Sequence, residues 1–506
     1  MDKLQKNIPN HWKWVILENI SKKITDGSHN PPKGIETGIP MLSAKNIQNN
    51  SIDFSDARYL TDEDFEIENQ RTSLETSDIL LTTVGTIGRV ALVPNNSKFV
   101  LQRSVTVIKP LINPKFLLYY FQSNEFQKKL NENATGTAQK GIYLNVIKQL
   151  EIPLAPLEEQ SRIVEKIEEL FSELDKNLQQ FNKCLINIDN LWELSLNKQI
   201  NNKSPFLIRL GSFISIKGGK RLPKNANYSN QKTQYPYIRV TDFLNYSIDE
   251  SNLKYINEDV YGKLEKYSIE NNEIYISIAG TIGLVGSIPN SITSAILTEN
   301  AAKLSINNKS ELIKDYLIYV LDSPFVKDQI TKSIKATSQP KLALYKIAEI
   351  QIPKHSLREQ KEIIEKLDEL KNNCDRLKTT INENILATEN LKSKILQEAF
   401  LGKLSTRLNT DSSTESLLKE IKICKENYLI KQQEIIKNRP KIKRMEKEKL
   451  SIIQVLEKHK KPISSIQLWE DSMFSNNIEI FYAELKKVQN KIKQEKIGSK
   501  TLISLV

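Results

Sequence analysis

The sequence predicts an α+β protein that contains two tandem α/β domains, two long helices and a small, mainly helical C-terminal module. Three observations support this class. A globular block occurs twice, each copy runs into a stripe of apolar residues with coiled-coil spacing, and a further segment follows the second stripe. A length of 506 residues allows three or four domains.

The duplication is visible in two matched stretches. GTIGRVALVP at 85–94 recurs as GTIGLVGSIP at 280–289, and residues 136–170 align without gaps to 336–370, with 14 identities among 35 positions. This period of about 200 residues is far longer than a solenoid repeat, which indicates a duplicated domain with a trailing element. The resulting segments are two globular domains at 1–155 and 204–355, long helices at 156–203 and 356–402, a charged helical linker at 403–449, and a small domain at 450–506 whose helical patterns fit a winged-helix-like module.

The trailing elements read as long helices. Apolar residues recur at steps of three and four from Ile163 to Trp192, and each helix could run for about 40 residues, or about 60 Å. The second stripe consists of Ile363, Leu367, Leu370, Cys374, Leu377, Ile381 and Ile385, continued by Leu391 and Ile395. One alternative is a homodimeric coiled coil. We predict instead that the two stripes pair within one chain, because this avoids the entropy cost of dimerisation.

Composition excludes several classes of protein. The longest apolar runs are far shorter than the ~20 residues of a membrane span, and the N-terminus lacks the apolar region of a secretory signal. Cys184, Cys374 and Cys424 are too few and too scattered for a disulfide framework or a cysteine-type zinc site. We therefore expect a soluble, cytoplasmic protein without membrane contact.

The charge is uneven along the chain. The net charge is +12, and residues 401–506 carry +9 of it. Basic composition leaves nucleic-acid binding open, since an AT-rich genome also raises lysine content. The last segment should fold around apolar positions, which are Leu456, Ile466, Trp469, Phe474, Phe481, Tyr482 and Leu485.

Signatures of catalysis are absent from the sequence. There is no phosphate-binding GxxxxGK[ST] loop, no cluster of histidines and no nucleophile beside a base. Pro31-Pro32 follows His29-Asn30, but this stretch is not flanked as the aromatic Asn/Asp-Pro-Pro motif of a methyltransferase is. This favours a non-catalytic binding protein. Candidate DNA-binding residues lie in the polar loops GTAQKG and ATSQPK, in the basic cluster KGGKRLPK, and in the matched segments IPMLSAKNI and YPYIRVTDF. They are Gln139, Lys140, Gln339, Lys341, Lys217, Lys220, Arg221, Lys45 and Arg239.

Two features allow a plainer interpretation. The polar loops could be ordinary solvated loops. The glycines of the GTIG turns could serve only the turn geometry, or could bring backbone N–H groups close to a phosphate.

Several stretches resemble the specificity subunit of type I restriction-modification enzymes. They are IPNHWKWVILENI at 8–20, LAPLEEQSRIVEKIEELFSELD at 154–175, its weaker copy PKHSLREQKEIIEKLDEL at 353–370, and ENLKSKILQEAFLGKLS at 389–405, with NLWELSLNKQI at 190–200 as a looser counterpart. The resemblance covers about residues 8–405 and does not extend to 406–506.

The resemblance implies a fold and a function. Two target-recognition domains related by a pseudo-twofold axis would be held apart on antiparallel coiled-coil helices, and each would read half of a bipartite, asymmetric DNA site. One such subunit per complex would bind two adenine methyltransferase subunits and the nuclease-translocase subunits. S-adenosylmethionine, ATP and Mg²⁺ would belong to those partners, with no cofactor or metal in this chain.

Two other functions remain open. One is a coiled-coil scaffold or homodimer that binds no DNA, and the other is a fused methyltransferase-specificity enzyme, which the missing catalytic motifs disfavour. For 406–506 we expect docking on a methyltransferase subunit first and nonspecific DNA contact second, against an accessory domain without effect.

Overall fold

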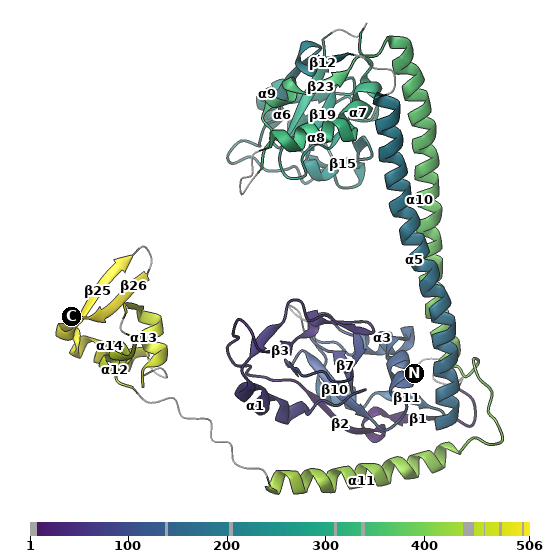
Figure 1. Cartoon of the computed structure of the whole chain (residues 1–506), viewed down its shortest axis with the longest axis vertical. Helices are drawn as coiled ribbons and strands as arrows, with labels where there is room; N and C mark the ends of the chain where they lie inside the picture. The colour runs from purple at the N-terminus through teal and green to yellow at the C-terminus, as the bar shows by residue number, and fades with distance from the viewer. Residues whose placement is uncertain are drawn as a thin grey trace. The chain divides into compact units, whose positions relative to one another are not determined.

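The computed structural model describes residues 8–136, 140–201, 206–307, 311–334, 340–438, 450–459, 461–474, 478–497 and 500–506. The chain forms two compact units, which are residues 1–421 and 422–506. In the first unit, two globular domains lie at opposite ends of a pair of long helices, α5 (Leu157–Asn201) and α10 (Leu357–Phe400) (Figure 1). Among the described residues, no helix has the length and apolarity needed to cross a membrane.

The two globular domains share one topology. Each has a four-stranded antiparallel sheet, a second small sheet in which two strands run parallel, and a two-strand ribbon that joins the start of the domain to its end. The first domain contains β2 (Ser21–Asp26), β10 (Val105–Pro110), β7 (Ile79–Thr82) and β8 (Val90–Leu92) in the first sheet, β6 (Arg58–Leu60), β3 (Ile39–Leu42) and β9 (Val100–Leu101) in the second, and β1 (Lys13–Ile16) with β11 (Glu151–Leu154) in the ribbon. The second domain contains β13 (Ile214–Gly218), β22 (Ala301–Ile306), β19 (Ile274–Ser277) and β20 (Val285–Gly286), then β17 (Lys254–Tyr255), β14 (Pro236–Ile238), β21 (Ser294–Leu297) and the additional β18 (Ser268–Glu270), then β12 (Leu207–Arg209) with β23 (Gln351–Pro353). The predicted duplication of an α/β domain is confirmed.

Two short helices cover each four-stranded sheet. They are α2 (Pro114–Gln122) and α3 (Asn124–Glu132) in the first domain, and α7 (Lys314–Asp322) and α8 (Pro324–Ser333) in the second. In each domain the two helices form one continuous stretch of the chain. The stretch is broken at Ser123 and Ser323, whose hydroxyl groups accept the N–H of Phe126 and Val326 and so cap the next helix.

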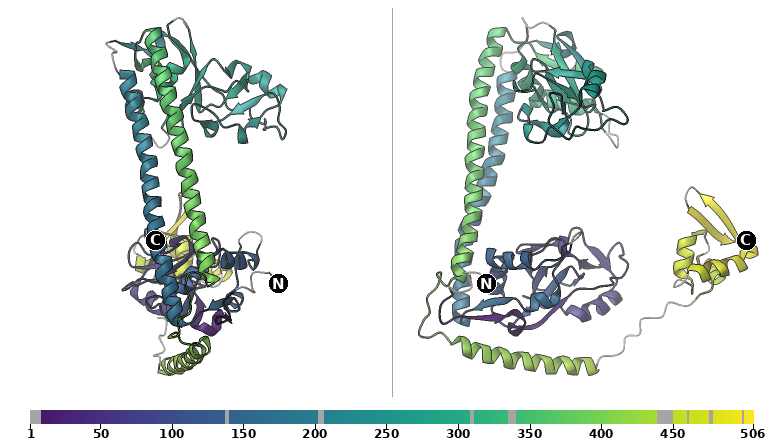
Figure 2. Two further views of the ribbon diagram at one scale, coloured as in Figure 1. Left: turned by 90° about the vertical axis from the view of Figure 1, so that its right-hand side faces the viewer. Right: turned by 180° about the vertical axis from the view of Figure 1, so that it is seen from behind.

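Each domain core is completed by both long helices. The first core includes Ile163 and Ile167 from the start of α5 together with Ile395 and Phe400 from the end of α10. The second core takes the opposite ends, namely Leu196 and Ile200 of α5 with Ile363 and Leu367 of α10. The helices therefore run antiparallel within one chain, and both views in Figure 2 show them side by side.

The seam between the helices differs from the predicted one in α10. The α5 seam is apolar, as the sequence suggested. In α10, however, Leu377 and Leu391 are exposed. The α10 residues that turn toward α5 follow alternating steps of three and four and are Lys371, Cys374, Lys378, Ile381, Ile385, Thr388, Lys392 and Ile395. Three of these seam positions are lysines, so a search for regularly spaced apolar residues does not find this register.

A buried glutamine fastens each domain to its helix. Gln160, near the start of α5, accepts the backbone N–H of Asn113 at 3.1 Å and donates to the carbonyl of Ala155 at 2.8 Å. Gln360 repeats this in the second domain, accepting from Ile313 at 2.9 Å and donating to His355 at 2.9 Å. A buried amide that satisfies backbone groups of two elements fixes the angle at which the helix leaves the domain.

The C-terminal unit has a small complete core. Its elements are α12 (Ile452–His459), β24 (Ile463–Ser464), α13 (Ser465–Asp471), α14 (Ile478–Lys487), β25 (Ile492–Ile497) and β26 (Lys500–Leu505), with the strands in the order β24-β26-β25. Leu456, Phe481 and Leu485 are buried as expected, whereas Ile466 and Tyr482 are exposed. The last helix ends at Lys487, and β25 pairs with the apolar C-terminal strand β26.

The segment 403–449 is helical only in part. Helix α11 spans Thr414–Asn438, and residues 439–449 lie outside the described residues. Leu417 and Ile421 in the first turns of α11 are buried in the core of the first domain. The start of this segment therefore belongs to the body of the protein rather than to a linker.

Each domain has an ion pair on its four-stranded sheet. The ammonium group of Lys109 lies 2.6 Å from Asp78, and both side chains are buried. Lys303 and Glu273 form a related pair at 3.0 Å, but Lys303 is partly exposed and occupies the strand position of Val107 rather than that of Lys109. Burial raises the pKa of Asp78 above its ordinary value despite the neighbouring lysine.

We predict that Lys109→Ala destabilises the first domain by about 3–5 kcal/mol, because it leaves a buried carboxyl group without its partner. Urea unfolding followed by circular dichroism measures the loss. The control is Lys98→Ala, which removes a pair between exposed side chains, Lys98 and Asp62, and should cost about 1 kcal/mol or less. Equal losses in the two variants would contradict the prediction.

Candidate nucleic-acid interface

Four loops meet at one edge of the second domain. The backbone N–H of Gly219, in the basic cluster, donates to the carbonyl of Ala301 at 2.9 Å. The N–H of Ile278, just before the GTIG turn, donates to the carbonyl of Asn300 at 2.7 Å. Leu342, which follows the polar loop, donates to Ile278 at 2.9 Å. Four segments are therefore adjacent in the fold although they are separated in sequence. They are the GTIG turn, the polar loop, the basic cluster and the loop that precedes β22.

The first domain builds the same edge. Gly27 donates to Val105 at 3.2 Å, Thr83 to Ser104 at 2.9 Å and Ile142 to Thr83 at 2.9 Å. The pairings correspond one by one to those of the second domain. The duplication has thus preserved a specific grouping of loops as well as the sheets beneath it.

Glycines at this edge have structural reasons. A Cβ atom at Gly27 or Gly219 would lie 2.2 or 2.1 Å from a backbone carbonyl oxygen, so only glycine fits there. In the GTIG turns, Gly85, Gly88 and Gly283 have positive φ angles of 80°, 93° and 93°. Their N–H groups donate to carbonyls of Lys140, Thr82 and Ser277, respectively. These three amides are therefore occupied within the protein, which supports the structural interpretation over a phosphate contact.

Basic side chains border the edge in the second domain. Lys217 and Lys220 are exposed, and the Lys220 ammonium lies 5.7 Å from the ring centre of Tyr267. Arg221 bonds to Glu299 at 2.6 Å while remaining largely exposed. Burial opposes ionisation of Glu299, but the hydrogen bond and the charge of Arg221, together with hydrogen bonds from the backbone and from Thr298, lower the pKa of Glu299. Lys341 is exposed beside the GTIG turn.

Arg239 is held differently from the other cations. Its guanidinium group makes two bonds to Asp242, at 2.6 and 3.1 Å, and its backbone N–H bonds to the same carboxylate. Arg221 and Arg239 line one shallow pocket together with Tyr237 and Thr298. The Asp242 pairing raises the pKa of Arg239 and fixes the loop after β14.

The predicted cations of the first domain are split between two places. Lys140 is exposed, and its carbonyl accepts the N–H of Gly85. Lys45 pairs with the exposed carboxylate of Asp56 at 2.5 Å. Gln139 and Gln339 lie outside the described residues.

Sequence reasoning missed one cation at this edge. Arg103 is exposed and makes no ion pair with any residue that the structure describes. It lies where the second domain has Glu299, in the loop that precedes β10. The two copies share too little sequence at this loop for the repeat to reveal it.

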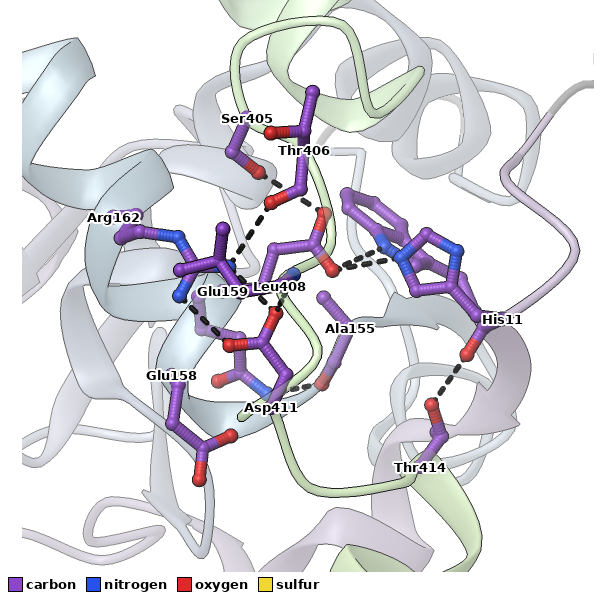
Figure 3. Close-up of polar contacts among 12 residues, drawn as sticks. His11, Ala155, Glu158, Glu159, Arg162, Ser405, Thr406, Leu408, Asp411 and Thr414 are labelled. Atoms are coloured by element: carbon purple, nitrogen blue, oxygen red, sulfur yellow. Dashed lines mark hydrogen bonds and ion pairs between the residues drawn. The ribbon is translucent and has the colours of Figure 1, made fainter.

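A second polar cluster joins the start of the first domain to the segment that follows α10 (Figure 3). The buried carboxylate of Glu159 in α5 accepts hydrogen bonds from His11 at 2.8 Å, Trp12 at 3.1 Å and Ser405 at 3.0 Å. Ser405 and His11 both bond to the carboxylate rather than to each other. The cluster therefore lacks the serine–histidine contact of a nucleophilic triad and serves as a junction.

The same junction anchors the segment that leads to α11. Arg162 makes bidentate bonds to Asp411 at 2.9 and 2.7 Å, and this lowers the pKa of Asp411 to about 2. Thr414 donates to the carbonyl of His11 at 2.5 Å. Among the described residues, no group of three or more histidine, cysteine, aspartate or glutamate side chains could hold a metal ion.

Comparison with known proteins gives the family. The family described as the type I restriction modification DNA specificity domain matches residues 16–181 and 207–387. The chain is 20% identical to the type I restriction enzyme EcoKI specificity subunit of Escherichia coli (strain K12), over 82% of this chain and 96% of that protein, and 23% identical to the EcoBI specificity subunit of Escherichia coli, over 60% and 70%. One solved structure concerns the complex assembly and conformational transition of the type I R-M system. A chain of it has a TM-score of 0.60 to this chain at 19% identity, and the match covers 78% of this chain and 99% of that one. Because the family matches both repeats and more than half of the chain, the protein belongs to the type I restriction-modification specificity subunits.

Proposed function

We propose that this chain is the non-catalytic subunit that determines which DNA sequence a type I restriction-modification complex recognises. Each globular domain would read one half of a bipartite, asymmetric site in double-stranded DNA. The observation that carries the proposal is the matched loop edge, built by the same backbone pairings in two domains at opposite ends of one helix pair. Duplicated edges with different side chains suit two different half-sites.

The helix pair would set the spacing between the half-sites. The part of the α5 seam that is free of either domain core lies between Leu174 and Trp192, which pack against the first and the second core, respectively. At 1.5 Å per residue this is about 27 Å, of the same order as the ~34 Å of one turn of DNA. Half-sites roughly one turn apart would present the same face of the duplex to both domains.

Exposed apolar residues support docking of two copies of one partner. Ile186 on α5 is 60% exposed and Leu386, 200 positions later on α10, is 58% exposed. Leu191 and Leu391 repeat this at 49% and 46%. Large apolar side chains left in water at repeat-related positions indicate equivalent contact surfaces.

The partners that fit this pattern are two adenine methyltransferase subunits around one specificity subunit. Nuclease-translocase subunits would join through them in the cytoplasm. The methyl donor, ATP and Mg²⁺ would be bound by the partners.

We expect that replacing residues 1–155 with the first domain of a relative changes only one half of the methylated motif. The physical reason is that each domain carries a complete edge of its own. Methylome sequencing of cells that express the chimera together with its methyltransferase measures the outcome. A motif altered in both halves would contradict modular reading.

Lys140→Ala and Lys341→Ala should each weaken DNA binding with little change in sequence preference. A lysine is a flexible point charge that suits a phosphate better than a base edge. The slope of log affinity against log salt concentration should fall by about one per variant, as measured by fluorescence anisotropy. The control is Lys98→Ala, an exposed lysine whose ammonium group is already paired with Asp62. An altered base preference at constant slope would reverse the assignment.

The two proposed docking surfaces can be tested by placing a charged residue on each of them. Ile186→Glu should weaken one methyltransferase contact at least about tenfold, because burying one such side chain is worth about 1.5–3 kcal/mol. Adding Leu386→Glu should weaken the other contact as well. Native mass spectrometry should then show the bound copies fall from two to one and then to none. Gln180→Glu, an exposed polar position on α5, should retain both copies.

A further inference from the structure

The C-terminal unit follows a recognisable order of elements. Helix α12 is followed by strand β24, helices α13 and α14, and the hairpin β25–β26, and the three strands form one antiparallel sheet (yellow in Figure 1). This is the order of a winged helix, a helix-turn-helix relative in which the third helix approaches the DNA groove and the hairpin lies beside the backbone. Fold alone does not establish DNA binding. DNA binding is therefore inferred from the exposed side chains of α14.

The outward face of α14 is polar. Phe481 and Leu485 point into the core, and helical periodicity places Tyr482 and Lys486, one position later in each case, on the flank of the helix beside that buried face. Both side chains are exposed. A phenol hydroxyl and an ammonium group are donors that proteins use on phosphate oxygens.

A cationic strip continues from this helix into the hairpin. Lys487 and Lys493 are exposed but pair with Glu484 at 2.6 Å and Glu495 at 3.2 Å. Lys486 and Lys491 make no ion pair with any described residue. Two unpaired ammonium groups thus flank the point where α14 turns into β25.

The unit is tethered to a protein that belongs to a DNA specificity family. Helix α11, which leads toward it, is rooted in the first domain through Leu417 and Ile421 and through the Arg162–Asp411 pair. Once the body is on DNA, a contact by the tethered unit is intramolecular. An effective concentration in the millimolar range makes even a weak phosphate contact count.

We propose that residues 450–506 form a winged-helix unit that binds duplex DNA through its phosphates, with Tyr482, Lys486 and Lys491 as the contacts. It would add affinity without adding sequence information. This goes beyond the reading of the bipartite site by the two domains. The first turn of α14 also exposes Ile478 and Ile480, the chemistry that a protein partner would use, and the experiment below separates the two.

The test compares the full-length chain with its Lys486→Ala/Lys491→Ala variant on duplexes with and without the recognised site. Fluorescence anisotropy across a salt series gives the slope of log affinity against log salt. Loss of two phosphate contacts should lower the slope by about 1.8 on both duplexes. At 50 mM salt the affinity should fall about tenfold while the methylated motif stays the same.

A charge-matched control is Lys458→Ala/Lys461→Ala, at the end of α12 and just beyond it, which should keep the wild-type slope. Thermal melting should be unchanged in both variants, since all four lysines are exposed. An unchanged slope in the Lys486/Lys491 variant overturns the proposal. An unchanged slope with weaker methyltransferase binding overturns it too and assigns the surface to a protein. Loss of site-specific binding alone would instead count against the two-domain reading.

Discussion

The antiparallel seam between α5 and α10 is the constraint on which the rest of the body depends. The two sides of the seam are chemically different. The α5 side is apolar, whereas α10 contributes Lys371, Lys378 and Lys392. The Lys378 ammonium meets Asp189 of α5 at 2.5 Å, and Lys392 pairs with Asp175.

This asymmetry specifies the partner. Two copies of α10 would place lysines against lysines, which disfavours a homodimer through that helix. The lysine stems instead cover apolar surface of α5, and the charged ends reach acids or rings. Lys371 lies 5.9 Å from the ring centre of Trp192, and Lys392 lies 5.2 Å from that of Phe171. The intrachain pair is therefore favoured by chemistry as well as by connectivity.

How far the sequence predicts this structure depends on the range of each interaction. The α5 seam was readable because its residues are apolar at regular steps. The α10 seam was misread at Leu377 and Leu391, since long cationic side chains can occupy seam positions that an apolar pattern cannot reveal. The Arg162–Asp411 pair joins positions 249 apart, and a single distant pair leaves no periodicity.

The candidate site shows the same limit. The repeat alone placed Lys140 and Lys341 in matched polar loops, and both lie exposed beside a GTIG turn. The ion pairs of Lys45 and Arg239, in contrast, depend on loop packing that no motif encodes. Arg103 escaped notice because its loop differs between the copies.

The duplication is broken at one end of the helix pair. Glu159 and Glu359 occupy equivalent positions, yet Glu359 caps its own helix through Ser356, whereas Glu159 is buried by Ser405 and His11. The difference arises because the chain continues past α10 and packs on the first domain as far as Ile421. The duplicated body thus carries one tail, rooted at one end. Any contact made by that tail occurs once per chain, so it would distinguish the two partner copies that we propose for the helix pair.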